Sequence, residues 1–351
     1  MFPHREWSQW TPRPALGRGR RRRRVLVLSL SLLVAVVALL GVGAGGIWWA
    51  TDHYGDKVAR IPDAFPTGPR PEKPHGPGAQ DSGGTTFLFA GVDSRSAKPT
   101  TGDAATAALW RFGAQRSDTL MLVHLGPGER TSYAVSLPRD SWVPIPGHGS
   151  AKINAAFSWG GPPLLIQTVE QLTGVRVDHF AVIDWHGFRA LTDAVGGVPI
   201  TVAADSYDPA QGRHFTAGTH VMHGHEALAY VRQRHGLPGG ELDRMKRQQQ
   251  FLRALAVEIR GHVSITHPLR VNRMLDAITR TVSVDDRLSN GDLRGLVFGL
   301  RHLNSADTHF TTAPIVRSEM IDRQYALILD RAGLRTLCHR IVTEHPPGSG
   351  K

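Results

Sequence analysis

Residues 118–138 read DTLMLVHLGPGERTSYAVSLP, two short apolar runs joined by the turn-rich segment GPGER. Apolar runs of this length that end at turn residues are typical of buried β-strands. A joint this short connects antiparallel neighbours, because parallel strands need a much longer crossover. We therefore expect strands over 118–125 and 131–138 to pair as a hairpin, within a sheet that is mixed.

The segments on either side alternate between strand and helix patterns. TTFLFAGVD and DHFAVIDWHGF read as further strands, and the 3.6-residue period predicts helices that end at glycine or basic residues. The alternation indicates a layered α/β domain of about 260 residues, running from 85 to 345. The expected strands are 85–93, 178–184 and 198–203, the expected helices are 162–174, 185–197, 225–232 and 242–261, and a pairing-competent stretch covers 308–316.

The N-terminal part has the composition of a membrane anchor. Residues 25–50 are VLVLSLSLLVAVVALLGVGAGGIWWA, without a charge, and about 20 apolar residues span a bilayer as a helix. Residues 1–24 hold eight arginines and one acid, a local +7 of the chain's +11. The positive-inside rule then places residues 1–24 in the cytoplasm and the rest, from about residue 51, outside. The sequence therefore predicts a single-pass protein of the cell membrane.

Alternatives remain for this region. GAGG at 43–46 is compatible with a cleaved signal peptide, and Gly41 and Gly45 have the spacing of a helix-pairing motif. The arginine tract could be a DNA-binding arm, but beside a membrane span it is better explained as an anchor, and we expect no nucleic-acid partner. Residues 51–84, rich in proline and glycine, are expected to be an extracytoplasmic linker, and 346–351 a polar tail.

Charged residues stand at the ends of three expected strands. Ligands gather at strand ends in open α/β sheets, and a few carboxylates together with phosphates suit Mg²⁺. Each residue taken alone is better explained as a turn residue or a surface ion pair. The pairs, in chain order, are Asp93 with Arg95, Arg116 with Asp118, and Arg139 with Asp140.

A second cluster lies in YVRQRHGLPGGELDRMKRQQQF, residues 230–251. If the chain is extended after Tyr230, Arg232 and Arg234 point the same way, whereas on a helix they diverge by about 200°. Arg244, Arg247 and Gln248 have i, i+3, i+4 spacing, which predicts one helix face. Guanidinium groups bind phosphate bidentately, although a solvated basic face explains the pattern as well.

Two other features of the sequence concern histidine and cysteine. HVMHGHEA, residues 220–227, leaves a histidine metal site open as an alternative to ordinary loop histidines. Cys338 is the sole cysteine, so an intrachain disulfide is impossible, and its place in the apolar segment RTLCHRI predicts a small buried side chain.

Eight motifs in order make the chain resemble the LytR-CpsA-Psr family over residues 85–260. They are FAGVDSR, RSDTLMLVHL, SLPRDSWV, KINAAFSWGG, DHFAVIDWHGF, VGGVPI, HEALAYVRQRH and ELDRMKRQQQF, behind one N-terminal apolar segment. The resemblance implies a three-layer α/β/α domain preceded by one transmembrane helix. It further implies a phosphotransferase that moves a glycopolymer from a polyprenyl-pyrophosphate carrier onto peptidoglycan, at a lipid membrane.

Site residues follow from the same resemblance. Asp93 and Asp118 match the metal-associated aspartates, for Mg²⁺ or alternatively Mn²⁺. The resemblance assigns catalysis to Arg139, Arg232, Arg234 and Asp93, and binding of the lipid pyrophosphate to Arg95, Arg139, Arg232, Arg234, Arg244, Arg247 and Gln248. Lys152 and Asn154 fall in a family motif without an assigned role, and Glu241 stands where an aspartate is more usual.

Three functions stay open at this point. Transfer to a peptidoglycan hydroxyl is the first, and Asp93 or Asp140 would accept the proton of that hydroxyl. The second is hydrolysis of the polyprenyl pyrophosphate, with water as the acceptor. The third is a lipid-phosphate-binding scaffold or membrane-bound regulator, although a cytoplasmic part of about 24 residues is too short to fold as a DNA reader.

Overall fold

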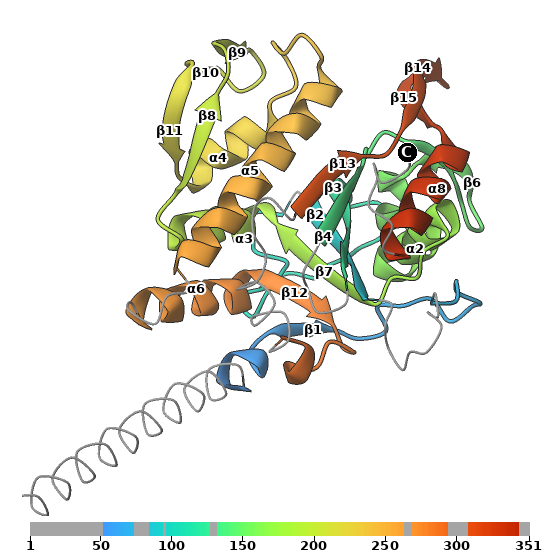
Figure 1. The fold of residues 1–351 in the computed structure, drawn as a ribbon, viewed down its shortest axis with the longest axis horizontal. Helices are drawn as coiled ribbons and strands as arrows, with labels where there is room; N and C mark the ends of the chain where they lie inside the picture. Colours follow the sequence, from blue (N-terminus) through green and yellow to red (C-terminus); the bar gives the residue numbers. More distant parts are fainter. Residues whose placement is uncertain are drawn as a thin grey trace, which may run out of the picture. The chain divides into compact units, whose positions relative to one another are not determined.

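A seven-stranded sheet forms the centre of the computed structural model, which describes residues 52–73, 84–93, 96–126, 132–262, 268–293 and 308–343. The strands lie in the order β1-β12-β7-β2-β3-β4-β13 (Figure 1). Their bounds are β1 Ala59–Ile61, β2 Thr85–Asp93, β3 Arg116–Leu125, β4 Ser132–Leu137, β7 His179–Asp184, β12 Val282–Asp285 and β13 Thr308–Thr312.

The sheet is mixed, as the sequence predicts. β2 is antiparallel to β3 and parallel to β7, while β3 is antiparallel to β4 and β4 is parallel to β13. Leu120 lies opposite Leu137, so the two runs of the 118–138 segment pair in the expected hairpin sense. The stretch that contains Thr308–Thr312 supplies the edge strand β13, which confirms that it is competent to pair.

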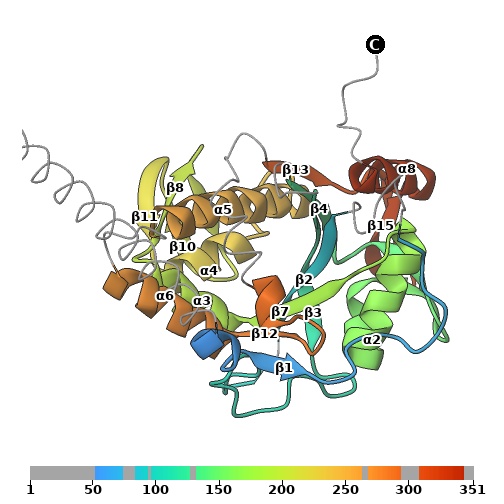
Figure 2. The ribbon, with the colours of Figure 1, turned by 60° about the horizontal axis from the view of Figure 1, so that its bottom comes forward.

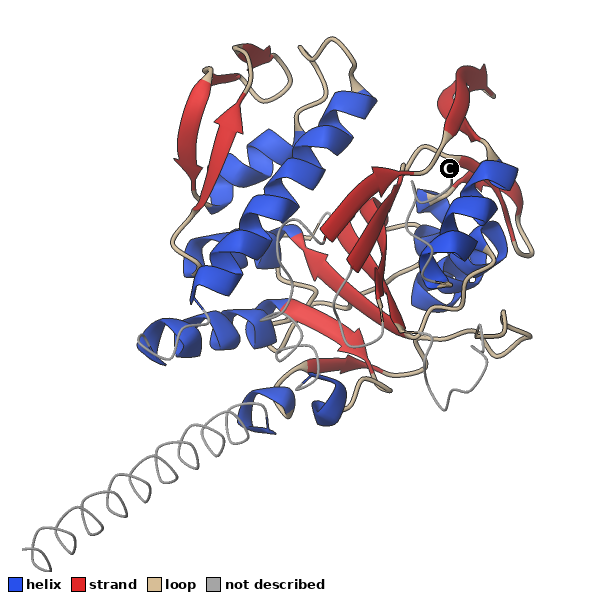
Figure 3. Ribbon diagram, viewed as in Figure 1, coloured by secondary structure: helices blue, strands red, loops and turns tan. Residues whose placement is uncertain are grey.

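Helices lie on both sides of the sheet (Figures 2 and 3). On one side α2 and α8 pack on Leu88, Ala90 and Val92, the residues of β2 that alternate to that face. On the other side lie α3, α4, α5 and α6, with a core of their own. The bounds are α2 Asn154–Thr173, α3 Trp185–Ala194, α4 Gly224–Arg232, α5 Glu241–His262, α6 Pro268–Thr281 and α8 Arg331–Val342.

Helix α2 is longer than the sequence predicts and kinked. Gly160 and Gly161 depart from helical geometry, and Gly161 has φ +62°, which a residue with a Cβ adopts only at a cost. Pro162 and Pro163 then begin the second segment, where a proline loses no hydrogen bond. Gly174, with φ +74°, ends the helix at the predicted glycine stop.

Part of the segment expected to be a linker belongs to the folded domain. Residues 59–61 form β1, which pairs in parallel with β12, and Tyr54 and Phe65 are buried. Arg70 donates to the buried carboxylate of Glu170 on α2 at 2.6 Å. Proline and glycine hid this edge strand, because three residues are too few to show a period. Folded structure therefore begins well before residue 85.

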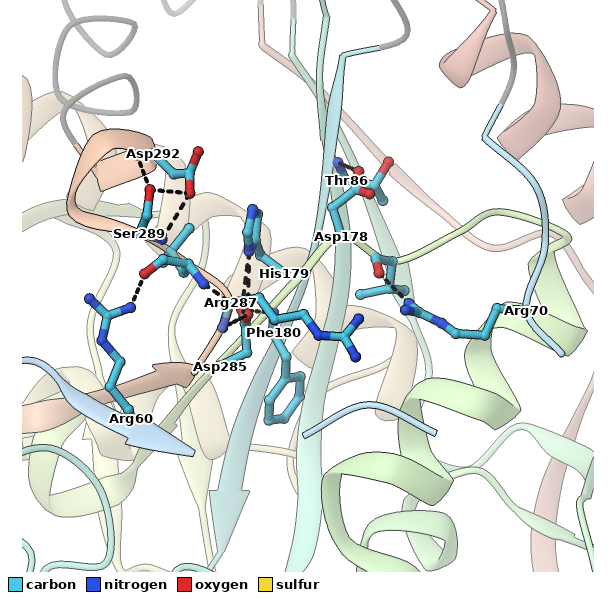
Figure 4. Close-up of polar contacts among 12 residues, drawn as sticks. Arg60, Arg70, Thr86, Asp178, His179, Phe180, Asp285, Arg287, Ser289 and Asp292 are labelled. Carbon is cyan, nitrogen blue, oxygen red and sulfur yellow. Dashed lines mark hydrogen bonds and ion pairs between the residues drawn. The ribbon is translucent and has the colours of Figure 1, made fainter. Parts of the chain in front are cut away.

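One buried carboxylate holds the turn after β12 (Figure 4). Asp285 accepts from the backbone N–H of Phe180 at 2.9 Å, from that of Arg287 at 2.9 Å, and from the His179 ring at 3.2 Å. Burial works against its charge, but these hydrogen bonds outweigh burial and hold the pKa of Asp285 below its ordinary value. This group ties β12 to β7 at the end of the sheet that carries Thr86 and Asp178.

Within the described ranges, four small antiparallel ribbons complete the domain. They are β5 Trp142–Ile145 with β6 Gly149–Lys152, β8 Val198–Val202 with β11 Gly218–Met222, β9 Ser206–Asp208 with β10 Arg213–Phe215, and β14 Ile315–Ile321 with β15 Gln324–Leu329. The expected strand at 198–203 therefore lies outside the central sheet. Cys338 is buried in α8, as predicted, and burial raises the pKa of its thiol to about 12.

No helix in the described ranges has the length and apolar character needed to cross a membrane. The basic segment 1–24, the expected span 25–50 and the expected tail 346–351 lie outside those ranges.

Candidate functional site

The charged strand ends meet at one end of the sheet. β3 runs antiparallel to its neighbours, so its beginning lies beside the ends of β2 and β4. Asp93, the last residue of β2, is opposite Arg116. Asp118 follows in β3, and Arg139 comes two residues after β4 ends. The strand topology thus brings together residues that are up to 46 positions apart in the chain.

Arg139 and Asp118 form the centre of this group. Arg139 donates to Asp118 at 2.5 Å, and its Nε lies 3.9 Å from Asp140. Burial acts against the Arg139 charge, but Asp118 outweighs burial, so the pKa of the guanidinium lies above its ordinary value. Asp140 is itself buried and paired with Lys152 at 3.0 Å. Lys152, which sequence reasoning left without a role, therefore fixes Asp140.

Arg232 reaches the same group from the last turn of α4. Its guanidinium lies 3.5 Å from the ring centroid of Trp185, the first residue of α3. Burial lowers the pKa of Arg232, and the charges of Asp93, Asp118 and Arg139 also act on it. Sequence reasoning missed Trp185, although it stands directly after a predicted strand in the quoted motif DHFAVIDWHGF. The stacking holds Arg232 near both aspartates.

The structure decides between the two alternatives for Arg232 and Arg234. Helix α4 ends at Arg232, and the backbone leaves the helix at Gln233, with ψ +127°. Arg234 therefore follows on non-helical chain, where its charge acts on Glu241. Arg232 and Arg234 therefore share neither a helix nor a strand, and the charges that act with them differ: Asp93 and Asp118 for Arg232, Glu241 for Arg234.

Glu241 and Arg244 form a buried ion pair at the start of α5. They are 4% and 5% exposed, and Arg244 donates to Glu241. Burial raises the pKa of Glu241 and lowers that of Arg244, and the charge of Arg139 acts on both. Three buried atoms here have no hydrogen-bond partner among the described residues: Nε of Arg139, Oε2 of Glu241 and Nε of Arg244. Buried polar atoms without partners are uncommon, so a polar ligand would complete them.

Arg247 and Gln248 turn away from this group. Arg247 donates to Gln233 at 2.5 Å and to Ser206 at 2.9 Å, and lies 4.2 Å from the ring centroid of Tyr230. Gln248 donates to the carbonyl of Val231 at 3.2 Å. The helix is the predicted one, but contacts with the β9 region draw Arg247 to another side, which a spacing rule cannot foresee. Arg95 lies outside the described residues.

Metal ligands were expected at Asp93 and Asp118. Both carboxylates act on Arg232, which places them around one cation. In the described part of the chain, no group of three or more histidine, cysteine, aspartate or glutamate side chains could hold a metal ion, and this includes the HVMHGHEA segment. Two carboxylates suit Mg²⁺ only when phosphate or water oxygens supply the other ligands.

Comparison with known proteins identifies a family and several relatives. The LytR_cpsA_psr family model matches residues 65–340. The cell wall biosynthesis protein LcpA of Corynebacterium glutamicum is 32% identical over 274 residues, covering 68% of this chain and 52% of LcpA. The probable cell wall biosynthesis protein LcpB of the same organism is 35% identical over 257 residues, covering 73% of this chain. The chain spans about half of LcpA and 61% of LcpB.

Solved structures share the fold. A crystal structure of protein gbs0355 from Streptococcus agalactiae has a TM-score of 0.63 at 25% identity, covering 74% of this chain and 87% of that one. A structure of TagT bound to LIIa-WTA has a TM-score of 0.61 at 24% identity, covering 80% of this chain and 98% of the TagT chain.

A further relative by sequence is the regulatory protein MsrR of Staphylococcus aureus. It is 33% identical over 208 residues, covering 59% of this chain and 62% of MsrR.

Proposed function

Because the chain belongs to the LytR-CpsA-Psr family, we propose that it transfers a glycopolymer from a polyprenyl-pyrophosphate carrier to peptidoglycan and releases polyprenyl phosphate. One observation carries the proposal: Asp118, Arg139, Arg232 and Arg244 come from separate elements, and the charges of Asp118 and Arg139 act on both Arg232 and Arg244. A diphosphate is the kind of ligand that such a collection of forked cations suits. The binding of LIIa-WTA by TagT, which has the same fold, supports a lipid-linked donor.

The unpartnered atoms support a phosphate ligand. Nε of Arg139 and Nε of Arg244 are buried donors without an acceptor among the described residues. Phosphate oxygens are strong acceptors that would satisfy both. Phosphoryl transfer depends mainly on positioning and on charge stabilisation, which arginines fixed by Asp118, Glu241 and Trp185 provide without rearranging.

Asp93 and Asp118 would hold Mg²⁺, or Mn²⁺, together with oxygens of the diphosphate. The ion would neutralise negative charge on the phosphates. Asp118 would then be shared between the ion and Arg139, whose hydrogen bond orients the carboxylate. The donor set of two carboxylates fits this use, because neither aspartate needs a third protein ligand when phosphates are present.

The reaction exchanges one phosphorus–oxygen bond for another. A hydroxyl oxygen of a peptidoglycan sugar would bond to the phosphorus that carries the glycan, and polyprenyl phosphate would leave with the electrons of the broken bond. The hydroxyl proton needs an acceptor. Asp140 is occupied by Lys152 and Arg139, which leaves Asp93 as the better of the two candidates from the sequence.

The polyprenyl chain needs an apolar surface beside the charged end. Phe89 lies in the middle of the central strand β2 yet is 43% exposed, and it stacks on Phe87 at a centroid distance of 5.8 Å. Both point to the face of the sheet opposite α2 and α8, where Phe87 packs with Val58, Ala181 and Val284. An exposed aromatic side chain in the central strand suits an isoprenoid tail. We further propose that residues 25–50 anchor this three-layer α/β/α domain to the cell membrane, with residues 1–24 in the cytoplasm.

The test uses the purified full-length chain with a labelled polyprenyl-pyrophosphate glycan, Mg²⁺ and nascent peptidoglycan. Arg232→Ala or Arg234→Ala should lower the transfer rate by about 10²-fold or more, because a desolvated contact to developing charge is lost. Lys246→Gln, which removes an exposed cation from α5, is the matched control and should keep wild-type turnover. Full activity of Arg232→Ala would refute the assignment.

The same assay separates the competing functions. A hydrolase would release the phosphorylated glycan equally well without peptidoglycan. A scaffold or regulator would bind the lipid donor but form no product. The name of MsrR, a regulatory protein, favours this alternative.

A further inference from the structure

A pocket of about 330 Å³ opens beside Asp93 and Arg232, two of the charged residues described above. Helices α3 and α4 pack against each other and provide most of its wall. On α4, His225, Leu228 and Arg232 follow at i, i+3 and i+7, so they share one face of the helix. That volume is at the lower end of the range for small-molecule sites and suits a single sugar unit. Asp93 and Arg232 line the pocket, and the charges of Asp118 and Arg139 act on Arg232, so the pocket adjoins the proposed diphosphate site.

Arg189 of α3 is a cation in the lining of this pocket that the proposed reaction does not use. One of its terminal nitrogens donates to Nε2 of His225 at 3.2 Å, and the other donates to Nδ1 of His186 at 3.0 Å. His186 Nε2 lies 3.3 Å from the carbonyl oxygen of Ser96. Because a guanidinium can only donate, the ring nitrogens that Arg189 contacts on His186 and His225 are the acceptors.

Two histidine rings, rather than a carboxylate, orient Arg189. Within the described ranges Arg189 has no ion pair with a carboxylate, in contrast to Arg139, which pairs with Asp118. Arg213, from β10, is exposed and adds another cation to the lining. The pocket therefore has three arginines against one carboxylate, Asp93, and its surplus positive charge calls for an anion.

The charge also decides which part of the substrate enters. A diphosphate held between Asp93 and Arg232 carries a lipid on one side and a sugar on the other. An isoprenoid tail gains nothing from a wall of arginines and would leave them without hydrogen-bond partners. The sugar side of the diphosphate is the part that fits.

We infer that this pocket binds an anionic group, a carboxylate or a phosphate, on the sugar attached to the substrate's pyrophosphate. Arg189 is the residue that contacts this group. The inference rests on the proposed function and names the class of glycan: acidic rather than neutral at its reducing-end sugar. Trp185 and Leu228 supply the apolar part of the lining against which the sugar ring lies.

Binding of soluble probes to the full-length chain, measured by calorimetry with Mg²⁺ present, tests this. UDP-glucuronate and UDP-glucose differ only in one carboxylate, and glucose 1,6-bisphosphate and glucose 1-phosphate differ only in one phosphate. The wild-type chain should bind the more acidic member of at least one pair about tenfold more tightly, and the responding pair identifies a carboxylate or a phosphate. Tenfold corresponds to about 1.4 kcal/mol, within reach of one charged hydrogen-bonded contact.

Variants assign the preference to the pocket. Arg189→Gln should bring the ratio within each pair close to one, Arg189→Lys should keep part of it, and Arg213→Gln, at an exposed position, should reduce it without a risk to folding. Arg317→Gln, an exposed arginine of β14, is the control and should keep the full ratio.

Equal binding of charged and neutral probes by the wild type, no binding of any probe at millimolar concentration, or a ratio that survives Arg189→Gln would overturn the inference. The probes require no transfer, so the outcome is separate from the fate of the proposed reaction. A preserved charge preference in a chain that forms no peptidoglycan product would overturn the reaction alone.

Discussion

Replacing Glu241 by glutamine removes one charge from a buried pair and leaves the shape almost unchanged. Arg244 is 5% exposed, and Glu241 is the side chain to which its guanidinium donates. Removing one partner of a buried ion pair costs about 3–5 kcal/mol, because the remaining charge stays desolvated. The charges of Asp118 and Asp140 also act on Arg244 and offset part of this cost. We therefore expect Glu241→Gln to lower the free energy of unfolding by about 3 kcal/mol.

Urea unfolding of the full-length chain, followed by circular dichroism, measures this loss. Lys246→Gln is the matched control on the same helix, because Lys246 also pairs at i, i+3 spacing but is 77% exposed. An exposed pair contributes at most about 1 kcal/mol. The double variant Glu241→Gln/Arg244→Met should recover most of the loss, since burial disfavours both charges of the pair.

Pyrophosphate links the same variant to function. If Arg244 binds a substrate phosphate, pyrophosphate with Mg²⁺ should raise the unfolding midpoint of Glu241→Gln more than that of the wild type, because the anion replaces the missing carboxylate. A loss below about 1 kcal/mol in Glu241→Gln, or an equal loss in Lys246→Gln, would refute the burial argument. An identical response of both proteins to pyrophosphate would refute the role of Arg244.

Three further predictions concern stability and affinity. Burial lowers the pKa of His124 to about 4, so the folded chain binds a proton at this ring less readily than the unfolded chain does. The free energy of unfolding should therefore be highest above about pH 6.5 and should fall by on the order of 3 kcal/mol towards pH 4. Urea midpoints across that range should be flatter in His124→Leu. Asp285→Asn should lower the free energy of unfolding by about 2 kcal/mol, because charge-assisted hydrogen bonds from Phe180 and His179 are weakened. Since the pKa of Asp285 is lowered in the folded chain, the wild type should lose this contribution only as the pH falls below about 4. Trp185→Leu should weaken pyrophosphate binding about fivefold in calorimetry, the equivalent of about 1 kcal/mol of stacking on Arg232, while unchanged affinity would show that the ring does not position the guanidinium.

Local pattern was a good guide to the elements and a poor guide to their partners. The runs 85–93 and 118–125 became β2 and β3, and the predicted helices 225–232 and 242–261 became α4 and α5, within one or two residues. The 198–203 run also formed a strand, but as a ribbon with β11 outside the central sheet. β1 escaped notice, because its place depends on β12, more than 200 residues later.

Some residues of the candidate site could likewise be predicted from the sequence, and others could not. Strand ends and the family motifs identified Asp93, Asp118, Arg139, Arg232 and Arg244, which the fold brings together. Spacing also grouped Arg247 with Arg244, yet Arg247 contacts Ser206 and Gln233 instead. Trp185 and Arg189 were overlooked, since stacking and imidazole contacts leave no periodic trace in a sequence.

The amino-acid sequence by itself determined the α/β class, the mixed sheet and the family, because strand and helix periods are local and motifs keep their order. Only the tertiary structure decided which charges share a ligand. A guanidinium several bonds from its backbone turns towards whichever acceptor the fold supplies, as Arg139 does towards Asp118 and Arg189 towards two histidines. The direction of a long side chain is set by contacts across the fold, not by its position along the chain.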